Sequence, residues 1–176
     1  MLPVPKPGFI YSSAIFFSSD RHHAAKFGSR VTVSRLSIDA KILNALTDTY
    51  NIEQVRLSLL SHPIFSRSLN VDKDFWHSGW ASGEALEFHY KNDDLEHHFY
   101  KTISSEAEEN DIHPSEMKNI FFENLNRNLI NQISSIIKSI GFDGIYCNER
   151  ITSDGKLAPM LILMSSEAMS EPKWFL

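Results

Sequence analysis

Residues 136–149 read IIKSIGFDGIYCNE and join the strongest helical pattern of the chain to a short strand. Apolar residues recur at steps of three and four over Ser115 to Ile140, which predicts one long helix with an apolar stripe facing a core. Pro114 suits its first turn and Gly141 its end, because proline needs no N–H there and glycine readily adopts the conformation that closes helices. A tight turn and a strand over Gly144 to Cys147 are expected to follow.

Further elements are predicted on both sides of this segment. Met160 to Met164 is a short apolar run between a proline and a Ser-Ser pair, as in a buried strand. Near the N-terminus, Ile15 to Ser19 reads IFFSS, and its aromatic residues favour a strand. Asp20 is suited to cap a short helix over Arg21 to Phe27, and another strand is expected over Arg30 to Ile38.

The middle of the chain has weaker patterns. Ile52 to Ser61 is expected to be a helix, because its apolar residues recur near a 3.6-residue spacing before a His-Pro pair stops it. Asp39 to Tyr50 is interpreted as a helical turn or two. Residues 50–115 are therefore predicted to form a mainly helical insertion within a single domain that covers residues 1–176.

Composition excludes several classes of protein. The chain has 176 residues, of which 42% are apolar and 22% charged, as in ordinary globular domains. No apolar run approaches the ~20 residues that cross a bilayer, and the N-terminal residues make a poor signal peptide, so no membrane partner is expected. The single cysteine, Cys147, excludes an intramolecular disulfide and a CxxC zinc site, and it is expected to be a small core residue.

The charge is acidic overall and unevenly spread. The net charge of −5 and the isoelectric point of about 5.9 disfavour nucleic acid as a partner, since nucleic-acid binders usually have basic surfaces. Residues 1–41 hold six basic and two acidic side chains, whereas residues 84–116 hold ten acidic and two basic ones. The acidic stretch is interpreted as a solvated surface, and the basic excess could face an anionic ligand.

Common catalytic and metal motifs are missing from the sequence. Neither of the glycine-rich phosphate loops, G-x-G-x-x-G and G-x-x-x-x-G-K-[ST], occurs, and there is no G-x-S-x-G elbow. The eight histidines include the adjacent pairs His22-His23 and His97-His98, and adjacent residues do not share one face of a helix. The histidines are interpreted as dispersed surface residues, and no metal is expected.

Two segments, in this order, resemble ADP-ribosyltransferase-like domains of the bacterial toxin and effector type. IFFSSDRHHAAKFGSRVTVSRLSID, residues 15–39, is similar to the family's strand that ends in Ser or Thr and is followed by a short helix with an alanine and an aromatic residue. IIKSIGFDGIYCNE and APMLILMSSEAM, residues 136–149 and 158–169, are similar to the family's helix, its G-[FY]-D-G-[IV] turn and its last strands.

The resemblance implies an α+β fold with a split antiparallel β-sheet core that holds NAD in a cleft between two small sheets. NAD is then the substrate: its nicotinamide–ribose bond breaks, and ADP-ribose passes to a macromolecular target, here expected to be a protein. A carboxylate near the ribose stabilises the oxocarbenium-like charge of such a reaction. The implied location is the cytoplasm, or a host cell if the chain is a secreted effector.

The resemblance also implies particular site residues. Ser18 and Ser19 match the family's strand-end hydroxyls, and Glu149 is the candidate for its catalytic carboxylate, so these three residues are predicted to be catalytic. The residues predicted to bind NAD are Tyr11, Ser12, Ser13, Phe17, Phe27 and Tyr146.

The chain departs from the family at two positions. The family carries an Arg or His on its first strand, whereas here Lys6 is the only base upstream of Ile15. The family's glutamate opens the last strand, at a position that here reads Ala158-Pro159-Met160, and none of these side chains carries a charge.

These departures leave two alternatives open. The first is a catalytically degenerate domain of the same fold that acts as a protein-interaction module, with residues 84–116 and the region of Trp76 and Trp80 as its partner surface. The second is an α/β domain with no relation to the transferases, in which Ser18 and Gly144 would not converge on one cleft.

Overall fold

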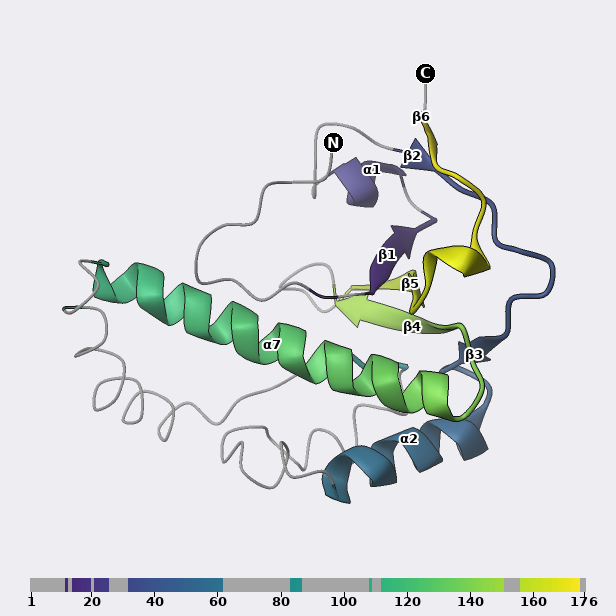
Figure 1. Cartoon of the computed structure of the whole chain (residues 1–176), viewed down its shortest axis with the longest axis horizontal. Helices are drawn as coiled ribbons and strands as arrows, with labels where there is room; N and C mark the ends of the chain where they lie inside the picture. The colour runs from purple at the N-terminus through teal and green to yellow at the C-terminus, as the bar shows by residue number, and fades with distance from the viewer. Residues whose placement is uncertain are drawn as a thin grey trace.

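A computed structural model describes residues 12, 14–19, 21–25, 32–61, 83–86, 108, 112–150 and 156–174. These residues form an α+β fold, as the sequence predicts (Figure 1). Its elements in chain order are β1 (Ile15–Ser18), α1 (Arg21–Ala24), β2 (Thr32–Val33), β3 (Ile42–Asn44), α2 (Thr49–Ser61), α7 (Pro114–Ser139), β4 (Gly144–Arg150), β5 (Leu157–Leu163), the 3-10 turn η4 (Ser166–Ala168) and β6 (Lys173–Trp174).

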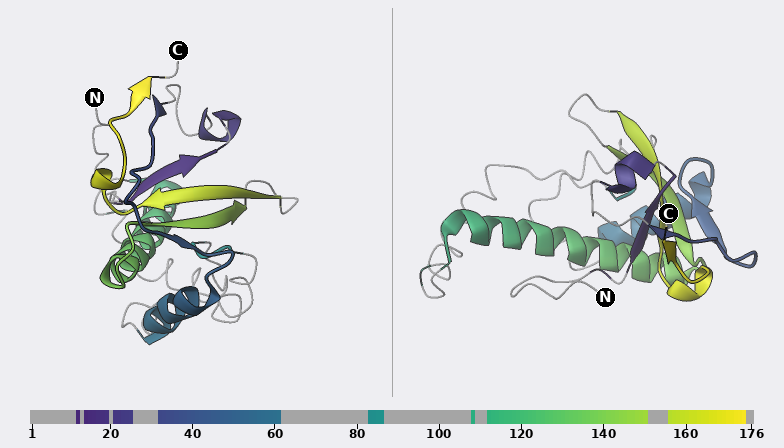
Figure 2. Two further views of the ribbon diagram at one scale, coloured as in Figure 1. Left: turned by 90° about the vertical axis from the view of Figure 1, so that its right-hand side faces the viewer. Right: turned by 90° about the horizontal axis from the view of Figure 1, so that it is seen from above.

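The strands form two sheets. The main sheet has four strands in the order β1-β5-β4-β3, in which β5 pairs antiparallel with β1 and β4, and β3 pairs parallel with β4. β2 and β6 make a separate antiparallel pair on the β1 side of the main sheet, joined to it by a bridge between Leu36 and Met169 (Figure 2). The ADP-ribosyltransferase type of this core stays a prediction.

The long helix predicted over Ser115 to Ile140 is confirmed as α7, and its end explains the turn that follows. Gly141 has a φ of 91°, a conformation that glycine adopts without a Cβ clash. The N–H groups of Gly141 and Phe142 donate to the carbonyls of Lys138 and Ile137 at 3.0 and 3.2 Å, the hydrogen-bond pattern of a Schellman motif. The motif reverses the chain, so that β4 begins directly beside α7.

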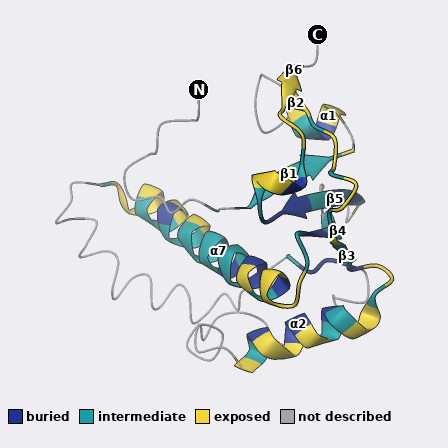
Figure 3. Ribbon diagram, turned by 45° about the vertical axis from the view of Figure 1, so that its right-hand side comes forward, coloured by how far each residue is buried: buried dark blue, intermediate teal, exposed yellow. Residues whose placement is uncertain are grey.

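The core lies between the main sheet and the helices α7 and α2 (Figures 2 and 3). The apolar stripe of α7 contributes to it through the C-terminal half of the helix. Burial of each such side chain stabilises the fold by roughly 1.5–3 kcal/mol. The core side chains with no exposed surface are Leu43, Val55, Leu59, Leu129, Ile133, Ile137 and Ile145.

The strands β4 and β5 are longer than the sequence predicts, because they pair with each other over their full length. Pro159 lies inside β5, opposite Asn148. The Asn148 N–H turns away from β5 and donates to the Gly83 carbonyl at 2.9 Å, so this is a non-hydrogen-bonded pair. The nitrogen of Pro159 therefore faces away from β4, at a position past Ser18, where β1 has ended. No ladder bond is lost there, and the strand tolerates the proline.

For residues 30–50, one expectation is confirmed in part and one is wrong. Of the strand expected over Arg30 to Ile38, the described residues form β2 and a bridge at Leu36, both paired with the C-terminal segment. The helical turns expected over Asp39 to Tyr50 are instead β3, whose pairing with β4 overrides the local pattern. Helix α2 follows after Asp48, whose carboxylate accepts from the Asn51 N–H at 3.2 Å as an N-cap.

Other expectations are confirmed in part. α1 begins at Arg21, and α2 ends at Ser61, as predicted. Most of the helical insertion expected over residues 50–115 lies outside the described residues, as do Phe27, Trp76 and Trp80. Within the described ranges, no helix has the length and apolarity needed to cross a membrane.

Close packing at the start of β4 generates a stability prediction. A Cβ on Gly144 would lie 2.6 Å from the Ile162 carbonyl oxygen and 2.8 Å from a Leu163 methyl carbon. Gly144→Ala is therefore expected to lower the free energy of unfolding by about 1–3 kcal/mol, measured by chemical denaturation. At Gly141 an added Cβ has no neighbour within 4 Å but the positive φ strains any other residue, so Gly141→Asn should cost about 1 kcal/mol from backbone strain without a clash. Equal stability of Gly144→Ala and the wild type would contradict the packing described here.

Candidate functional site

Two clefts flank the edge strand β1, one on each face of the main sheet. The larger, of about 650 Å³, lies between β1, α1 and α7, and we call it the His23 cleft. The smaller, of about 340 Å³, lies between the main sheet and the segment that leads from β2 towards β3, and we call it the Tyr146 cleft. Phe17 and Ser18 border both clefts.

The His23 cleft combines an apolar floor with several polar groups. The sheet contributes Phe16, Ser18, Glu149 and Met160, and the N-terminal segment contributes Ser12. One face of α7 supplies the opposite wall, because positions three and four apart lie side by side on a helix. The residues of that wall are Glu123, Asn126, Arg127 and Ile130.

Strand register places Ser18 and Glu149 on the same face of the sheet. Ser18 pairs with Met160 across β1 and β5, and Met160 pairs with Cys147 across β5 and β4. Paired residues share a face, and Glu149 lies two residues beyond Cys147, so its side chain points to that face too. The carboxylate named as the catalytic candidate is thus in the same cleft as a catalytic serine candidate.

His23 holds the Glu149 carboxylate. Its Nε2 lies 3.3 Å from Glu149 Oε2, and since an ionised carboxylate only accepts hydrogen bonds, Nε2 is the donor. The His23 residue is 5% exposed, whereas 42% of the Glu149 side chain is exposed. A buried ring therefore orients a carboxylate that remains open to a ligand.

The Tyr146 cleft is more apolar. Phe17, Tyr146 and Leu161 share the sheet face opposite to Glu149, because alternate strand residues point to opposite sides. Its polar lining residues include Ser18, Ser19, Ser34 and Arg35. The remaining side chains of its wall are Leu36, Pro159, Leu163 and Met169.

The predicted site residues are therefore divided between two faces of one sheet. Ser12 and Glu149 lie in the His23 cleft, Ser19 and Tyr146 lie in the Tyr146 cleft, and Phe17 and Ser18 border both. Glu149 is three positions after Tyr146 on the same strand, and residues an odd number of positions apart point to opposite faces. The other three residues predicted to bind NAD, Tyr11, Ser13 and Phe27, lie outside the described residues.

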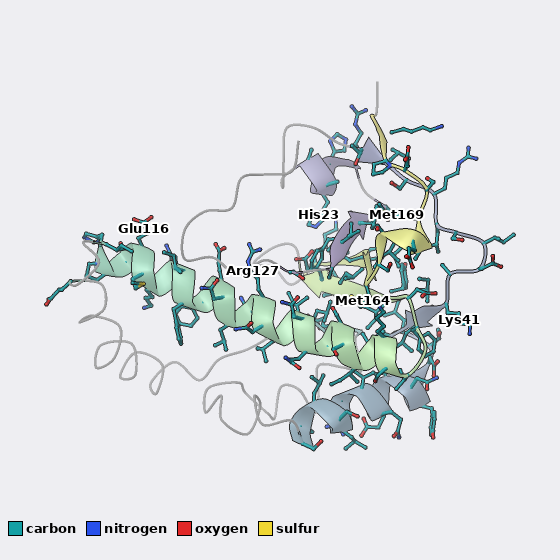
Figure 4. All side chains as sticks on the ribbon, viewed as in Figure 1. His23, Lys41, Glu116, Arg127, Met164 and Met169 are labelled. Carbon is teal, nitrogen blue, oxygen red and sulfur yellow. The ribbon has the colours of Figure 1, made fainter. Side chains whose placement is uncertain are left out.

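Sequence reasoning missed the contribution of two helices. The expectation that the histidines are surface residues is wrong for His23, which α1 turns inward while His22 stays exposed. The polar wall of α7 was hidden because the helix was interpreted only through its apolar stripe. Figure 4 shows His23 on α1 and Arg127 on the side of α7 that faces α1 and β1.

Gly144 lines neither of the two clefts, as the hypothesis of an unrelated domain predicts. It is buried against β5, where the Ile162 carbonyl leaves no room for a side chain. Tyr146 and Glu149 of the same strand are the residues that reach the clefts. Among the described residues, no three His, Cys, Asp or Glu side chains come together as a metal site would need.

Comparisons with protein-family models, with curated proteins and with solved structures give no match for this chain.

Cys147 is a core residue, as the sequence predicts, and it is 1% exposed. Burial, together with the negative charge of Glu149, raises the pKa of its thiol from 9.0 to about 12. The raised pKa keeps the thiol protonated at neutral pH, and a thiol is a poor nucleophile compared with a thiolate. The group therefore belongs to the core and not to the chemistry of the adjacent cleft.

The thiol pKa generates a labelling prediction. At pH 8, a shift of about three units lowers the thiolate fraction about 1000-fold, and burial further blocks access. Reaction of Cys147 with a disulfide reagent such as DTNB should therefore be more than 100-fold slower in the native chain than in guanidinium. Because Cys147 is the only cysteine, the absorbance change reports this residue alone. Equal rates in the two conditions would show that the strand is open.

Proposed function

We propose that this chain transfers ADP-ribose from NAD to a protein target, with the His23 cleft as its active site. The observation that supports this most is the Glu149 carboxylate, held by His23 and open to the cleft that Ser18 also lines. The volume of the His23 cleft, about 650 Å³, lies within the ~300–1,000 Å³ range of ordinary small-molecule sites.

The position of Glu149 supports its assignment as a substitute for the glutamate that the family carries on its last strand. Ala158 is one of the residues that stand where the family's glutamate is expected, and Glu149 is directly opposite Ala158 in the β4–β5 ladder. Cβ atoms of directly opposite residues lie about 4.5–5.5 Å apart on the same face of a sheet. A carboxylate on the neighbouring strand can therefore reach the space that a glutamate at 158 would serve.

The chemistry requires few groups. As the C1′–N bond of NAD breaks, nicotinamide leaves with the bonding electron pair, and positive charge develops on the ribose. The Glu149 carboxylate is suited to stabilise that charge and to accept from a ribose hydroxyl. The target nucleophile then attacks C1′ and loses its proton to a base or to water. His23 does not touch the substrate in this scheme; it positions Glu149.

A second candidate is the interaction module, and one surface favours it. Val33, Leu36 and Ile38 are 46%, 45% and 98% exposed along the segment from β2 towards β3. Exposed apolar side chains that lie close together on one segment often mark contact surfaces between proteins. The two candidates are separated by whether NAD is cleaved.

The charge of Glu149 is the test of the proposed chemistry. Glu149→Gln keeps the size of the side chain but removes the negative charge, so nicotinamide release, followed by chromatography, should fall at least about 100-fold. NAD binding, followed by calorimetry, should not weaken in parallel, because loss of this carboxylate charge lowers the repulsion of the diphosphate in the ground state. The matched control is Glu167→Gln on η4, an exposed glutamate that lines neither cleft.

Four outcomes decide between the candidates. Loss of release in Glu149→Gln but not in Glu167→Gln supports the transferase. Release at the wild-type rate by Glu149→Gln rejects Glu149 as the catalytic carboxylate. Absence of NAD binding by the wild type at millimolar concentration rejects the proposed ligand, and binding without release leaves the interaction module as the better account.

A further inference from the structure

We propose that Arg127 of α7 is the phosphate-binding residue of the His23 cleft and thereby selects ligands that carry a diphosphate. The inference deepens the proposed function and rests on it for the identity of NAD as the ligand. Diphosphate binding by Arg127 can nevertheless be tested on its own.

The first argument is the position of Arg127. It lies on the wall of the His23 cleft that α7 supplies, across from the face of the sheet that carries Ser18 and Glu149 (Figure 4). Its side chain is 34% exposed and lines the cleft, so the guanidinium is accessible to a ligand. The neighbouring Asn126 lines the same wall.

The second argument is charge. Arg127 is the one Lys or Arg among the described residues that line the His23 cleft, whereas Glu123 and Glu149 line it as carboxylates. A ligand with two phosphate charges would be repelled by this pair of carboxylates without a cation to neutralise it. Arginine is well suited to the task, because its planar fork donates two parallel hydrogen bonds to a phosphate.

The third argument is the ion pair that Arg127 makes with Glu123. Its Nη2 lies 3.4 Å from Glu123 Oε2, one turn earlier on the same helix, and 52% of the Glu123 side chain is exposed. An exposed i,i+4 pair of this length is weak, so a phosphate can displace it. Glu123 keeps the guanidinium in place before binding and competes with the ligand during binding.

The position of Arg127 offers an explanation for the missing base on the first strand, which is one of the two departures from the transferase pattern. The base expected on the first strand is missing upstream of Ile15, where Lys6 stands alone. Arg127 supplies a cation to the cleft from a helix that lies more than 100 residues later in the sequence. In this proposal, the cation that donates to the phosphate stands on the helix that covers the sheet and not on the sheet itself.

The experiment measures binding of ADP-ribose, inorganic pyrophosphate and adenosine by calorimetry at low salt, with thermal melting as the check of folding. Arg127→Gln should weaken ADP-ribose and pyrophosphate binding at least 10-fold and leave adenosine binding unchanged. Arg127→Lys should lose part of the affinity, because a point charge replaces the fork. Glu123→Gln should strengthen pyrophosphate binding severalfold, since it removes the competing carboxylate.

Two matched controls locate the effect. Lys138→Gln removes a positive charge from the exposed far end of the same helix, and it should not alter binding. Arg35→Gln removes the arginine of the Tyr146 cleft. Loss of pyrophosphate binding in Arg35→Gln with no loss in Arg127→Gln would overturn the inference and assign the phosphate to the other cleft.

The remaining outcomes keep the inference and the proposed function apart. Failure of the wild type to bind pyrophosphate and ADP-ribose at millimolar concentration overturns the inference. Binding of ADP-ribose that depends on Arg127, without nicotinamide release from NAD, supports the inference and rejects the transferase. Release of nicotinamide that is unaffected by Arg127→Gln supports the transferase and overturns the inference about Arg127.

Discussion

The pairing of β4 with β5 is the constraint on which the other parts of the molecule depend. The two strands are in register from Gly144 opposite Leu163 to Arg150 opposite Leu157. This register sends Ile145, Cys147 and Ile162 to the face that α7 covers. A slip by one residue would turn the core side chains towards the opposite cleft and Tyr146 towards the core. Packing of the core and the position of Glu149 are therefore fixed by the same set of backbone hydrogen bonds.

Much of the fold could be predicted from local patterns. α7 has a long apolar period, a proline at its start and a glycine at its end, and all three signals agree. β3 could not be predicted in this way, because its three residues are extended through pairing with a strand that lies 100 residues later. Pro159 within β5 is similar, since only the geometry of its neighbours shows that its missing N–H does no harm.

The candidate site could be predicted only in part, for a related reason. Strand alternation alone would have separated Tyr146 from Glu149, because they are three positions apart along β4 and so point to opposite faces. The inward direction of His23 and the cleft wall on α7 depend on how helices pack against the sheet. No local pattern gives this information. Residues such as Arg127 look like ordinary surface positions of a helix until the opposite wall is known.

The Schellman turn after α7 has a further consequence for the cleft. It anchors the helix beside β4, whereas Arg127 lies about 18 Å from that anchor along the helix axis, at 1.5 Å per residue. Because of this distance, a tilt of the helix axis by a few degrees at the anchor would displace the guanidinium by about 1 Å. The contacts between α7 and α2 govern that tilt from outside the cleft. Substitutions at the contact between α7 and α2 can therefore change the width of the cleft without changing any residue that lines it.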